Sequence, residues 1–146
     1  MKISPEKLDE LIKIVHLAGI EIIKIYKKKV TKKYKSDNTP VTNADIRANN
    51  IICKGLKLHF PEVSIVSEEQ VKKGKAAKKF WLVDPLDGTK EFLKGNGEFT
   101  VNIGLIENKK PVFGIIYMPT KNKLYFTKDK KSYFSKLSKK GQLSNI

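Results

Sequence analysis

The chain has 146 residues, and its 30 Lys and Arg outnumber 15 Asp and Glu, which gives a formal net charge of +15 at pH 7. With 40% hydrophobic and 31% charged residues, the composition is typical of one globular domain and excludes a wholly disordered chain. A single cysteine, Cys53, excludes an internal disulfide and a cysteine-rich zinc site. No apolar run approaches the roughly 18 residues of a membrane span, and the N-terminus lacks a signal-peptide core. We therefore expect a soluble, cytoplasmic protein.

The positive charge leaves nucleic-acid binding open as an alternative, because phosphate neutralisation dominates such binding. However, Arg47 is the only arginine, and the lysines are spread along the chain. Base readout and bidentate phosphate contacts favour arginine over lysine. We expect attraction of small polyanions rather than a dedicated nucleic-acid interface.

Residues 4–29 are predicted to form an amphipathic helix. Ser4 supplies an N-cap and Pro5 the first helical position. Apolar residues then recur at helical spacing: Leu8, Leu11, Ile12, Val15, Ala18, Ile22 and Ile25. The basic segment 27–35 is interpreted as a loop or edge hairpin, and residues 37–40 as a turn.

A second helix is predicted over residues 43–59. Thr42 would be its N-cap, with Asp45 three residues later as an acidic variant of the capping box. Ala44, Ala48, Ile51, Ile52 and Leu56 would form its buried face.

The pattern then changes to strands. We predict strands over 63–66, 80–83, 99–105, 112–118 and 124–126, and a short helix near 89–94. The continuous apolar run at 80–83 favours a strand covered on both faces. From Lys128 onward the chain is polar, and no clear element is predicted. The layout indicates an α+β domain, with two helices packed on a mainly antiparallel sheet.

Four carboxylates are predicted to fall at strand ends or at a helix start: Asp45, Glu68, Asp84 and Asp87. Oxygen ligands without His or Cys select Mg²⁺, Mn²⁺ or Ca²⁺ rather than zinc. A tight turn at Asp84-Pro85-Leu86-Asp87 could aim both side chains and the Leu86 carbonyl at one point. Because clustered carboxylates repel one another, a cation is the natural way to hold them together.

Gly88-Thr89 opens the predicted short helix, whose free backbone N–H groups would make an anion site beside the metal. A metal next to a helix N-terminus is suited to phosphate-ester hydrolysis. Each element has a simpler interpretation when taken alone. Residues 84–88 could be an ordinary turn, Asp45 a helix cap, and Glu68 part of a solvated loop.

The longer string from Trp81 to Phe92, WLVDPLDGTKEF, resembles the signature of the lithium-sensitive, Mg²⁺-dependent phosphatase superfamily that includes inositol monophosphatase. PVTNAD at 40–45 resembles its upstream aspartate motif, and SEE at 67–69 its glutamate-pair motif. The segment NGEFTVNI at 96–103 is similar to the CysQ branch, the 3′(2′),5′-bisphosphate nucleotidases. This resemblance implies the N-terminal half of the αβαβα sandwich of that superfamily.

The resemblance also implies roles for individual residues. Glu68 and the Leu86 carbonyl would ligate a first metal, Asp84 would bridge two metals, and Asp87 would hold the second. Asp45 and Thr89 would orient and help deprotonate the attacking water. The Gly88 and Thr89 amides would hold the substrate phosphate, which Glu68, Leu86 and Asp87 would also border.

The implied cofactor is Mg²⁺, with Mn²⁺ as a substitute and Li⁺ as an inhibitor. The implied reaction converts 3′-phosphoadenosine 5′-phosphate and water to AMP and phosphate, a step in sulfur metabolism.

The sequence departs from the family pattern in one respect. Family members continue into a second α/β domain with a Trp-Asp motif, whereas the only tryptophan here is Trp81. We expect a family domain over 1–127, a polar tail over 128–146, no C-terminal α/β domain, and weakened activity. Self-association, or a separate polypeptide that supplies the C-terminal half, would follow from an exposed docking surface. A non-catalytic metal- or phosphate-binding remnant remains the alternative function.

Overall fold

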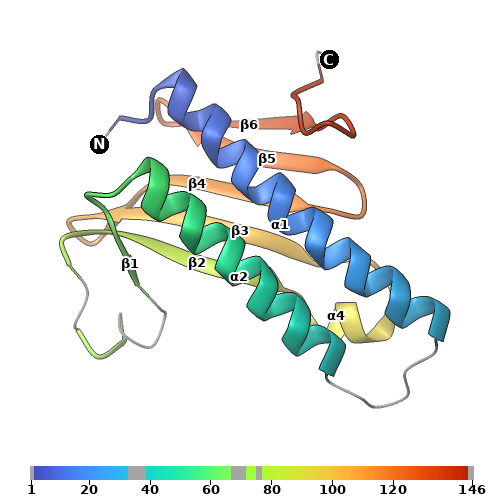
Figure 1. Cartoon of the computed structure of the whole chain (residues 1–146). Helices are drawn as coiled ribbons and strands as arrows, with labels where there is room; N and C mark the ends of the chain where they lie inside the picture. The colour runs from blue at the N-terminus through green and yellow to red at the C-terminus, as the bar shows by residue number, and fades with distance from the viewer. Residues whose placement is uncertain (1, 33–38, 67–71, 75–76, 145–146) are drawn as a thin grey trace.

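The computed structural model describes residues 2–32, 39–66, 72–74 and 77–144, without the side chains of 29–32, 39 and 40. Two long helices, α1 (Pro5–Lys32) and α2 (Thr39–His59), lie side by side across a six-stranded sheet (Figure 1). The strands and the short helix between them are β1 (Ser64–Val66), β2 (Lys79–Asp87), α4 (Thr89–Lys94), β3 (Thr100–Glu107), β4 (Lys110–Met118), β5 (Lys123–Lys128) and β6 (Lys131–Lys136). The sheet order follows the chain, β1 to β6, and the β1–β2 pair is parallel while the other pairs are antiparallel. The predicted α+β class is confirmed. Among the described residues, no helix has the length and apolarity needed to cross a bilayer.

Helix α1 begins as predicted and ends later than predicted. The backbone N–H of Lys7 donates to Ser4 Oγ at 3.2 Å, which is the N-cap bond, and Pro5 takes the first helical position. The helix continues to Lys32, so the interpretation of residues 27–32 as a loop or hairpin was wrong. Lysine is a good helix former whose charged end stays in water, so a lysine run extends a helix as readily as it forms a loop.

Helix α2 begins at Thr39, earlier than predicted, so Thr42 lies inside the helix and the proposed capping box is not at the N-terminus. Pro40 was interpreted as part of a turn. It instead occupies the first helical turn, where a missing N–H leaves no intrahelical bond unmade.

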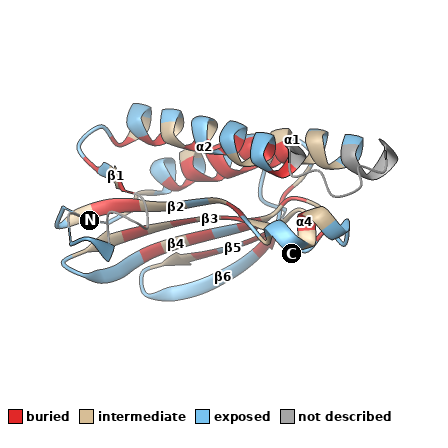
Figure 2. Cartoon of the chain, turned by 90° about the horizontal axis from the view of Figure 1, so that it is seen from below, coloured by how far each residue is buried: buried red, intermediate tan, exposed pale blue. Residues whose placement is uncertain are grey.

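The hydrophobic core lies between the helices and one face of the sheet. Ala18 of α1, Ala48 of α2, and Trp81, Leu105 and Ile115 of the strands are fully buried there. Figure 2 shows both long helices on the same side of the sheet, with their buried residues turned toward it. We call the side of the sheet away from α1 and α2 the open face.

The open face corrects in part the prediction that the strand at 80–83 is covered on both sides. Trp81 points into the core, whereas Leu82 is only half-buried on the open face. Phe80, two residues before Leu82 and therefore on the same face, is buried, so this side of the apolar run is covered at Phe80 and only partly covered at Leu82.

The C-terminal segment also differs from the prediction. Asp129 and Lys130, with φ of 51° and 63°, form the turn of a two-residue hairpin that leads into β6. Tyr133 stacks on Phe126 with ring centroids 5.4 Å apart, and Leu137 is buried further on. The sheet thus extends beyond residue 127, where we expected the domain to end. An edge strand needs partners on one side only, so it tolerates the lysines that suggested a polar tail.

Gly19 of α1 generates a stability prediction, because it lies against Tyr117 of strand β4 with no room for a side chain. A Cβ atom built there would lie 2.6 Å from the ring of Tyr117, whose hydroxyl donates to Asn122 Oδ1 at 2.7 Å. We expect Gly19→Ala to lower the free energy of unfolding, measured by urea denaturation. Overpacking costs about 1–3 kcal/mol, against about 1 kcal/mol gained in helix propensity.

Gly114→Ala is the control, since nothing lies within 4 Å of a Cβ atom built at that position. It should leave the unfolding free energy unchanged or raise it. A Gly19→Ala protein as stable as the wild type would contradict the close approach.

Candidate active site at the end of strand β2

An extra residue in β2 places two aspartates on the same face of the sheet. Asp84 lies opposite Asn102 on β3, and Asp87 lies opposite Thr100, so three steps along β2 match two steps along β3. Residues three apart on a regular strand point to opposite faces. The β-bulge restores the phase, and both aspartates therefore share the open face with Asn102 and Thr100. The tight turn that we expected at 84–87 is instead a bulged continuation of the strand.

A short hydrogen-bond chain on β3 supports Asp87. Asn102 Nδ2 donates to Asp87 Oδ2 at 3.2 Å, and Thr100 Oγ1 donates to Asn102 Oδ1 at 2.8 Å. The threonine fixes which end of the amide faces the carboxylate. Neither Asn102 nor Thr100 stands out in the sequence, because only the strand register shows that they oppose the aspartates.

Leu86 anchors the bulge from the other side. Its side chain is 2% exposed and belongs to the hydrophobic core, while the aspartates on either side of it are exposed. Packing of one apolar side chain thus holds the backbone between two carboxylates. The role of the Leu86 carbonyl as a metal ligand stays a prediction.

Helix α4 follows directly, and Gly88 makes the junction possible. Gly88 has φ of 94°, and a Cβ atom there would lie 2.9 Å from the Glu98 backbone oxygen. Its own carbonyl accepts from the Phe92 N–H at 2.9 Å. The glycine is therefore required by its conformation and by a close backbone contact. The proposed phosphate contacts of the Gly88 and Thr89 amides stay predictions.

An aromatic cluster holds α4 against α1. Phe92 and Phe99 are fully buried, and Tyr26 of α1 packs on both, with ring centroids 5.4 and 4.9 Å apart. Such ring pairs add to the stability gained from burial alone. The cluster therefore ties the start of β3 and the short helix to the helical layer.

Asp45 lies near the start of α2 and is half-buried. Figure 1 shows that α4 lies at the same end of the molecule as the start of α2. Burial raises the pKa of its carboxyl above the usual value of 3.8. Glu68 lies outside the described residues. Within the described part of the chain, no three His, Cys, Asp or Glu side chains gather as a metal site. The structure thus brings Asp84 and Asp87 onto one face and does not join Asp45 to them in such a cluster.

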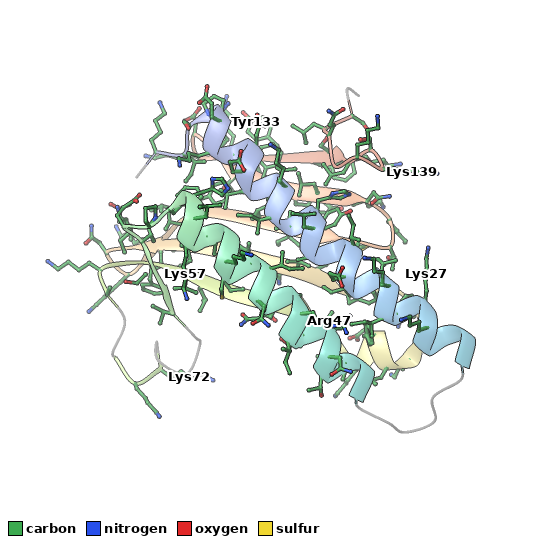
Figure 3. All side chains as sticks on the ribbon, viewed as in Figure 1. Lys27, Arg47, Lys57, Lys72, Tyr133 and Lys139 are labelled. Atoms are coloured by element: carbon green, nitrogen blue, oxygen red, sulfur yellow. The ribbon has the colours of Figure 1, made fainter. Side chains whose placement is uncertain are left out.

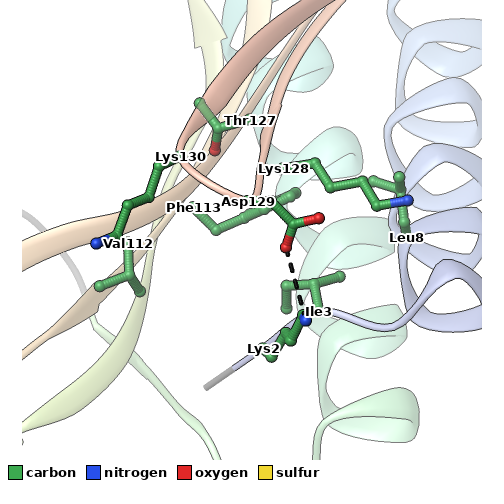
Figure 4. A pocket seen from close by; sticks show the side chains of 9 residues that line it. All are labelled: Lys2, Ile3, Leu8, Val112, Phe113, Thr127, Lys128, Asp129 and Lys130. Atoms are coloured by element: carbon green, nitrogen blue, oxygen red, sulfur yellow. Dashed lines mark ion pairs between the residues drawn. The ribbon is translucent and has the colours of Figure 1, made fainter.

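Asp84 borders a hollow of about 710 Å³ on the open face, whose floor includes Gly104 and Gly114. A separate pocket of about 280 Å³ lies beside the N-terminus, where Lys2 Nζ is 3.9 Å from Asp129 Oδ1 (Figure 4). Neither Asp84 nor Asp87 lines that pocket.

Basic side chains are spread over the molecule. Lys27, Lys57, Lys72 and Lys139 come from different segments and lie in different parts of Figure 3. This spread agrees with the lysine distribution in the sequence.

Gly88 yields a prediction with a matched control. Gly88→Ala should lower the free energy of unfolding by about 1–3 kcal/mol. A residue with a side chain is strained at the positive φ of Gly88, and its Cβ atom would meet the backbone oxygen of Glu98. Gly74 also has positive φ, at 68°, but nothing lies within 4 Å of a Cβ atom there. Gly74→Ala should therefore cost less. Equal losses in urea denaturation would show that the contact with Glu98 contributes nothing.

Asp45 yields a prediction about pH. Its raised pKa means that the folded state holds the proton more tightly than the unfolded state, so stability is lost as pH rises through the folded-state pKa. Asp45→Asn removes this penalty. We expect its Tm at pH 7 to equal or exceed that of the wild type, and the advantage to shrink as pH falls toward 4.

Asp9→Asn is the control, because Asp9 is exposed on α1 and the change in charge is the same. A Tm advantage of similar size and pH dependence in Asp9→Asn would point to net charge rather than to burial of Asp45.

Comparison with known proteins places this arrangement in a family. The profile of the inositol monophosphatase family matches residues 5–145. The 3′(2′),5′-bisphosphate nucleotidase CysQ of Buchnera aphidicola is 50% identical over 123 residues, which cover 81% of this chain and 46% of the relative. CysQ of Escherichia coli K12 is 43% identical over 131 residues, covering 86% and 53%.

Solved structures agree. A crystal structure of CysQ from Bacteroides thetaiotaomicron superposes with a TM-score of 0.70 at 38% identity, covering 89% of this chain and 49% of that one. The extragenic suppressor protein suhB of Bartonella henselae gives 0.71 at 27% identity, covering 87% and 50%. The chain spans about half the length of the curated relatives it matches. The match over residues 5–145 establishes that the chain belongs to the inositol monophosphatase family.

Proposed function

We propose that this chain carries the metal- and phosphate-binding part of a 3′(2′),5′-bisphosphate nucleotidase. Such an enzyme hydrolyses the 3′-phosphate of 3′-phosphoadenosine 5′-phosphate and yields AMP and phosphate. The observation that carries the proposal is the bulge in β2, which sets Asp84 and Asp87 on one face directly before α4. Its support from relatives is their shared name, CysQ, at 43–50% identity.

The donors at this place suit a hard divalent cation. Asp84 and Asp87 offer carboxylate oxygens, and no His or Cys lies between Cys53 and the C-terminus except His59 on α2. Oxygen donors of this kind select Mg²⁺ or Mn²⁺. Glu68 and the Leu86 carbonyl are the further ligands that we propose. Inhibition by Li⁺ is part of the same proposal.

When bound, magnesium would lower the pKa of a water molecule and neutralise charge on the phosphoryl oxygens. The protein's own contribution is positioning. Asn102 holds the Asp87 carboxylate at one oxygen, and Leu86 fixes the backbone between the two aspartates. Thr89, the first residue of α4, would orient the attacking water, and its N–H and that of Gly88 would donate to the substrate phosphate.

Asp45 would accept a proton from the attacking water together with Thr89. A carboxyl whose pKa is raised is a stronger base than an ordinary aspartate, which favours this role. The raised pKa follows from burial and comes at the expense of stability, as is common at functional sites.

Because the chain matches about half of its relatives' length, we propose that a complete site needs groups from the other half. A metal- and phosphate-binding protein without turnover is the second candidate function, and the same half-length match favours it. Metal binding and hydrolysis are therefore tested separately.

The first test is calorimetric titration with Mg²⁺ and Mn²⁺. We expect weak, saturable binding to the wild type and its loss in Asp84→Asn, because one of the carboxylates that would hold the metal is removed. Asp129→Asn, the same chemical change at the pocket of Figure 4, should bind as the wild type does. Equal heats from wild type and Asp84→Asn would remove the metal site.

The second test is hydrolysis of 3′-phosphoadenosine 5′-phosphate against inositol 1-phosphate. We expect the nucleotide to have the higher kcat/KM when the chain is fused to the unmatched part of the Buchnera relative. The 146-residue chain alone should be slower by about 10² or more, since positioning groups are missing. A higher kcat/KM on inositol 1-phosphate would contradict the nucleotidase assignment while leaving the family unchanged.

A further inference from the structure

A pocket of about 590 Å³ lies between residues 16–27 of α1 and the turn that joins β4 to β5. Its volume is within the range of small-molecule sites, about 300–1,000 Å³. The segment that follows β6 also reaches the pocket, through Lys139. Neither Asp84 nor Asp87 lines it, so it is separate from the candidate active site.

The α1 side of this pocket is apolar at its centre. His16, Ile20, Ile23 and Lys27 follow one another at spacings of three or four residues, so they form one stripe along the helix. Ile20 is 38% exposed, and Pro119 adds apolar surface from the opposite turn. The pocket therefore offers a wall against which an apolar ring can lie.

The charged residues that line the pocket are all basic. They are Lys24 and Lys27 of α1 and Lys139 of the C-terminal segment, and no Asp or Glu among the described residues lines it. Lys24 is paired with Glu21 at 2.9 Å, but Glu21 is not part of the lining. Positive charge gathered at a hollow attracts an anion, and three lysines favour a dianion over a monoanion.

Two neutral side chains supply hydrogen-bond donors. His16 is 9% exposed and its ring packs edge-on to Tyr117, yet its ring nitrogens form no hydrogen bond with another described residue. Burial lowers the pKa of His16, so at pH 7 its neutral ring has one N–H donor. Asn122 Oδ1 accepts from the Tyr117 hydroxyl at 2.7 Å, which leaves the Asn122 Nδ2 group to donate. A polar group as buried as His16 calls for a ligand or water as its partner.

The segment that carries Lys139 is held against the pocket at two points. The Leu137 N–H donates to the Asn122 carbonyl at 2.8 Å. Gly141, with φ of 78°, lies so close to His16 that a Cβ atom built there would be 2.5 Å from Nδ1. The arrangement of the pocket is therefore fixed before a ligand arrives, which lowers the entropy cost of binding.

We propose that this pocket binds a small organic phosphate. The apolar ring of the ligand lies against Ile20 and Ile23, and its phosphate group lies among the three lysines. The lining explains why both parts are needed, since an inorganic ion would leave the apolar wall in water and an uncharged ring would leave the lysines without a counter-ion. The proposal concerns a place away from the β2 aspartates, and it does not require that the chain hydrolyses a phosphate ester.

The probe is phenylphosphonate, which combines a phenyl ring with a phosphonate dianion and has no ester bond to hydrolyse. The chain has two histidines, His16 and His59, so the proton NMR spectrum has two imidazole Hε1 signals, which His59→Gln assigns. At pH 8 we expect phenylphosphonate to shift the His16 signal saturably, with a Kd of about 1 mM, as is typical of so small a ligand. Benzyl alcohol and inorganic phosphate, which each keep one part of the probe, should bind at least about tenfold more weakly.

Lys24→Gln tests the basic part of the lining. It should weaken phenylphosphonate binding about fivefold, the effect of one unit charge at about 4 Å in water. Lys13→Gln is the matched control, because Lys13 also pairs with a glutamate three residues earlier on α1 but does not line the pocket. It should bind the probe as the wild type does.

Ile20→Ser tests the apolar wall. It should weaken the binding of phenylphosphonate and leave that of inorganic phosphate unchanged. Leu17→Ser is the control, since Leu17 is an exposed aliphatic residue of α1, 53% exposed, that does not line the pocket.

A His16 signal that phenylphosphonate leaves unmoved would overturn the proposal. Equal weakening in Lys24→Gln and Lys13→Gln would also overturn it, because net charge would then explain the binding. A shift that disappears in Asp84→Asn would overturn it too, since the probe would then occupy the candidate active site. Because the measurement is binding without turnover, a chain that binds at this pocket and hydrolyses nothing would contradict the proposed function alone.

Discussion

Burial of one face of the sheet under α1 and α2 is the constraint from which the other features of this protein follow. Ala18 and Ala48 of the helices and Trp81 and Leu105 of the strands are fully buried in the core between the two layers. Because period-2 alternation sends every second side chain into this layer, the remaining side chains must stand on the other face. The open face is thus a direct consequence of the core.

The bulge in β2 determines the geometry of the candidate active site. The side chain of Leu86 is buried in the core. Because the strand contains one extra residue at this point, Asp84 and Asp87 nevertheless both lie on the open face. The same apolar burial that stabilises the sheet therefore sets the spacing of two carboxylates. Gly88 then turns the chain into α4, and the contact of Phe92 with Tyr26 returns it to the helical layer.

The distribution of charge separates two kinds of surface. Lysines on α1, α2 and the loops keep the protein strongly positive, which favours encounter with phosphorylated small molecules. Ile116, Tyr125 and Phe134, which are neighbours across β4, β5 and β6, instead expose apolar surface on the open face.

By itself the sequence determined the α+β class, the Ser4 cap, the short helix over 89–94, the core strands, and the resemblance to the inositol monophosphatase family. These are local signals: capping chemistry, hydrophobic period, and a contiguous motif from Trp81 to Phe92. It misjudged where α1 ends and where α2 begins, and it missed the last strand, because lysine-rich segments and Pro40 are compatible with more than one local structure.

Only the tertiary structure decided that Asp84 and Asp87 face the same way, that Asn102 holds one of them, and that Leu82 and Ile116 lie on an uncovered face. Each of these depends on the register between strands. Register is set by packing against the helices and by a single extra residue, and neither leaves a mark that can be read along one strand.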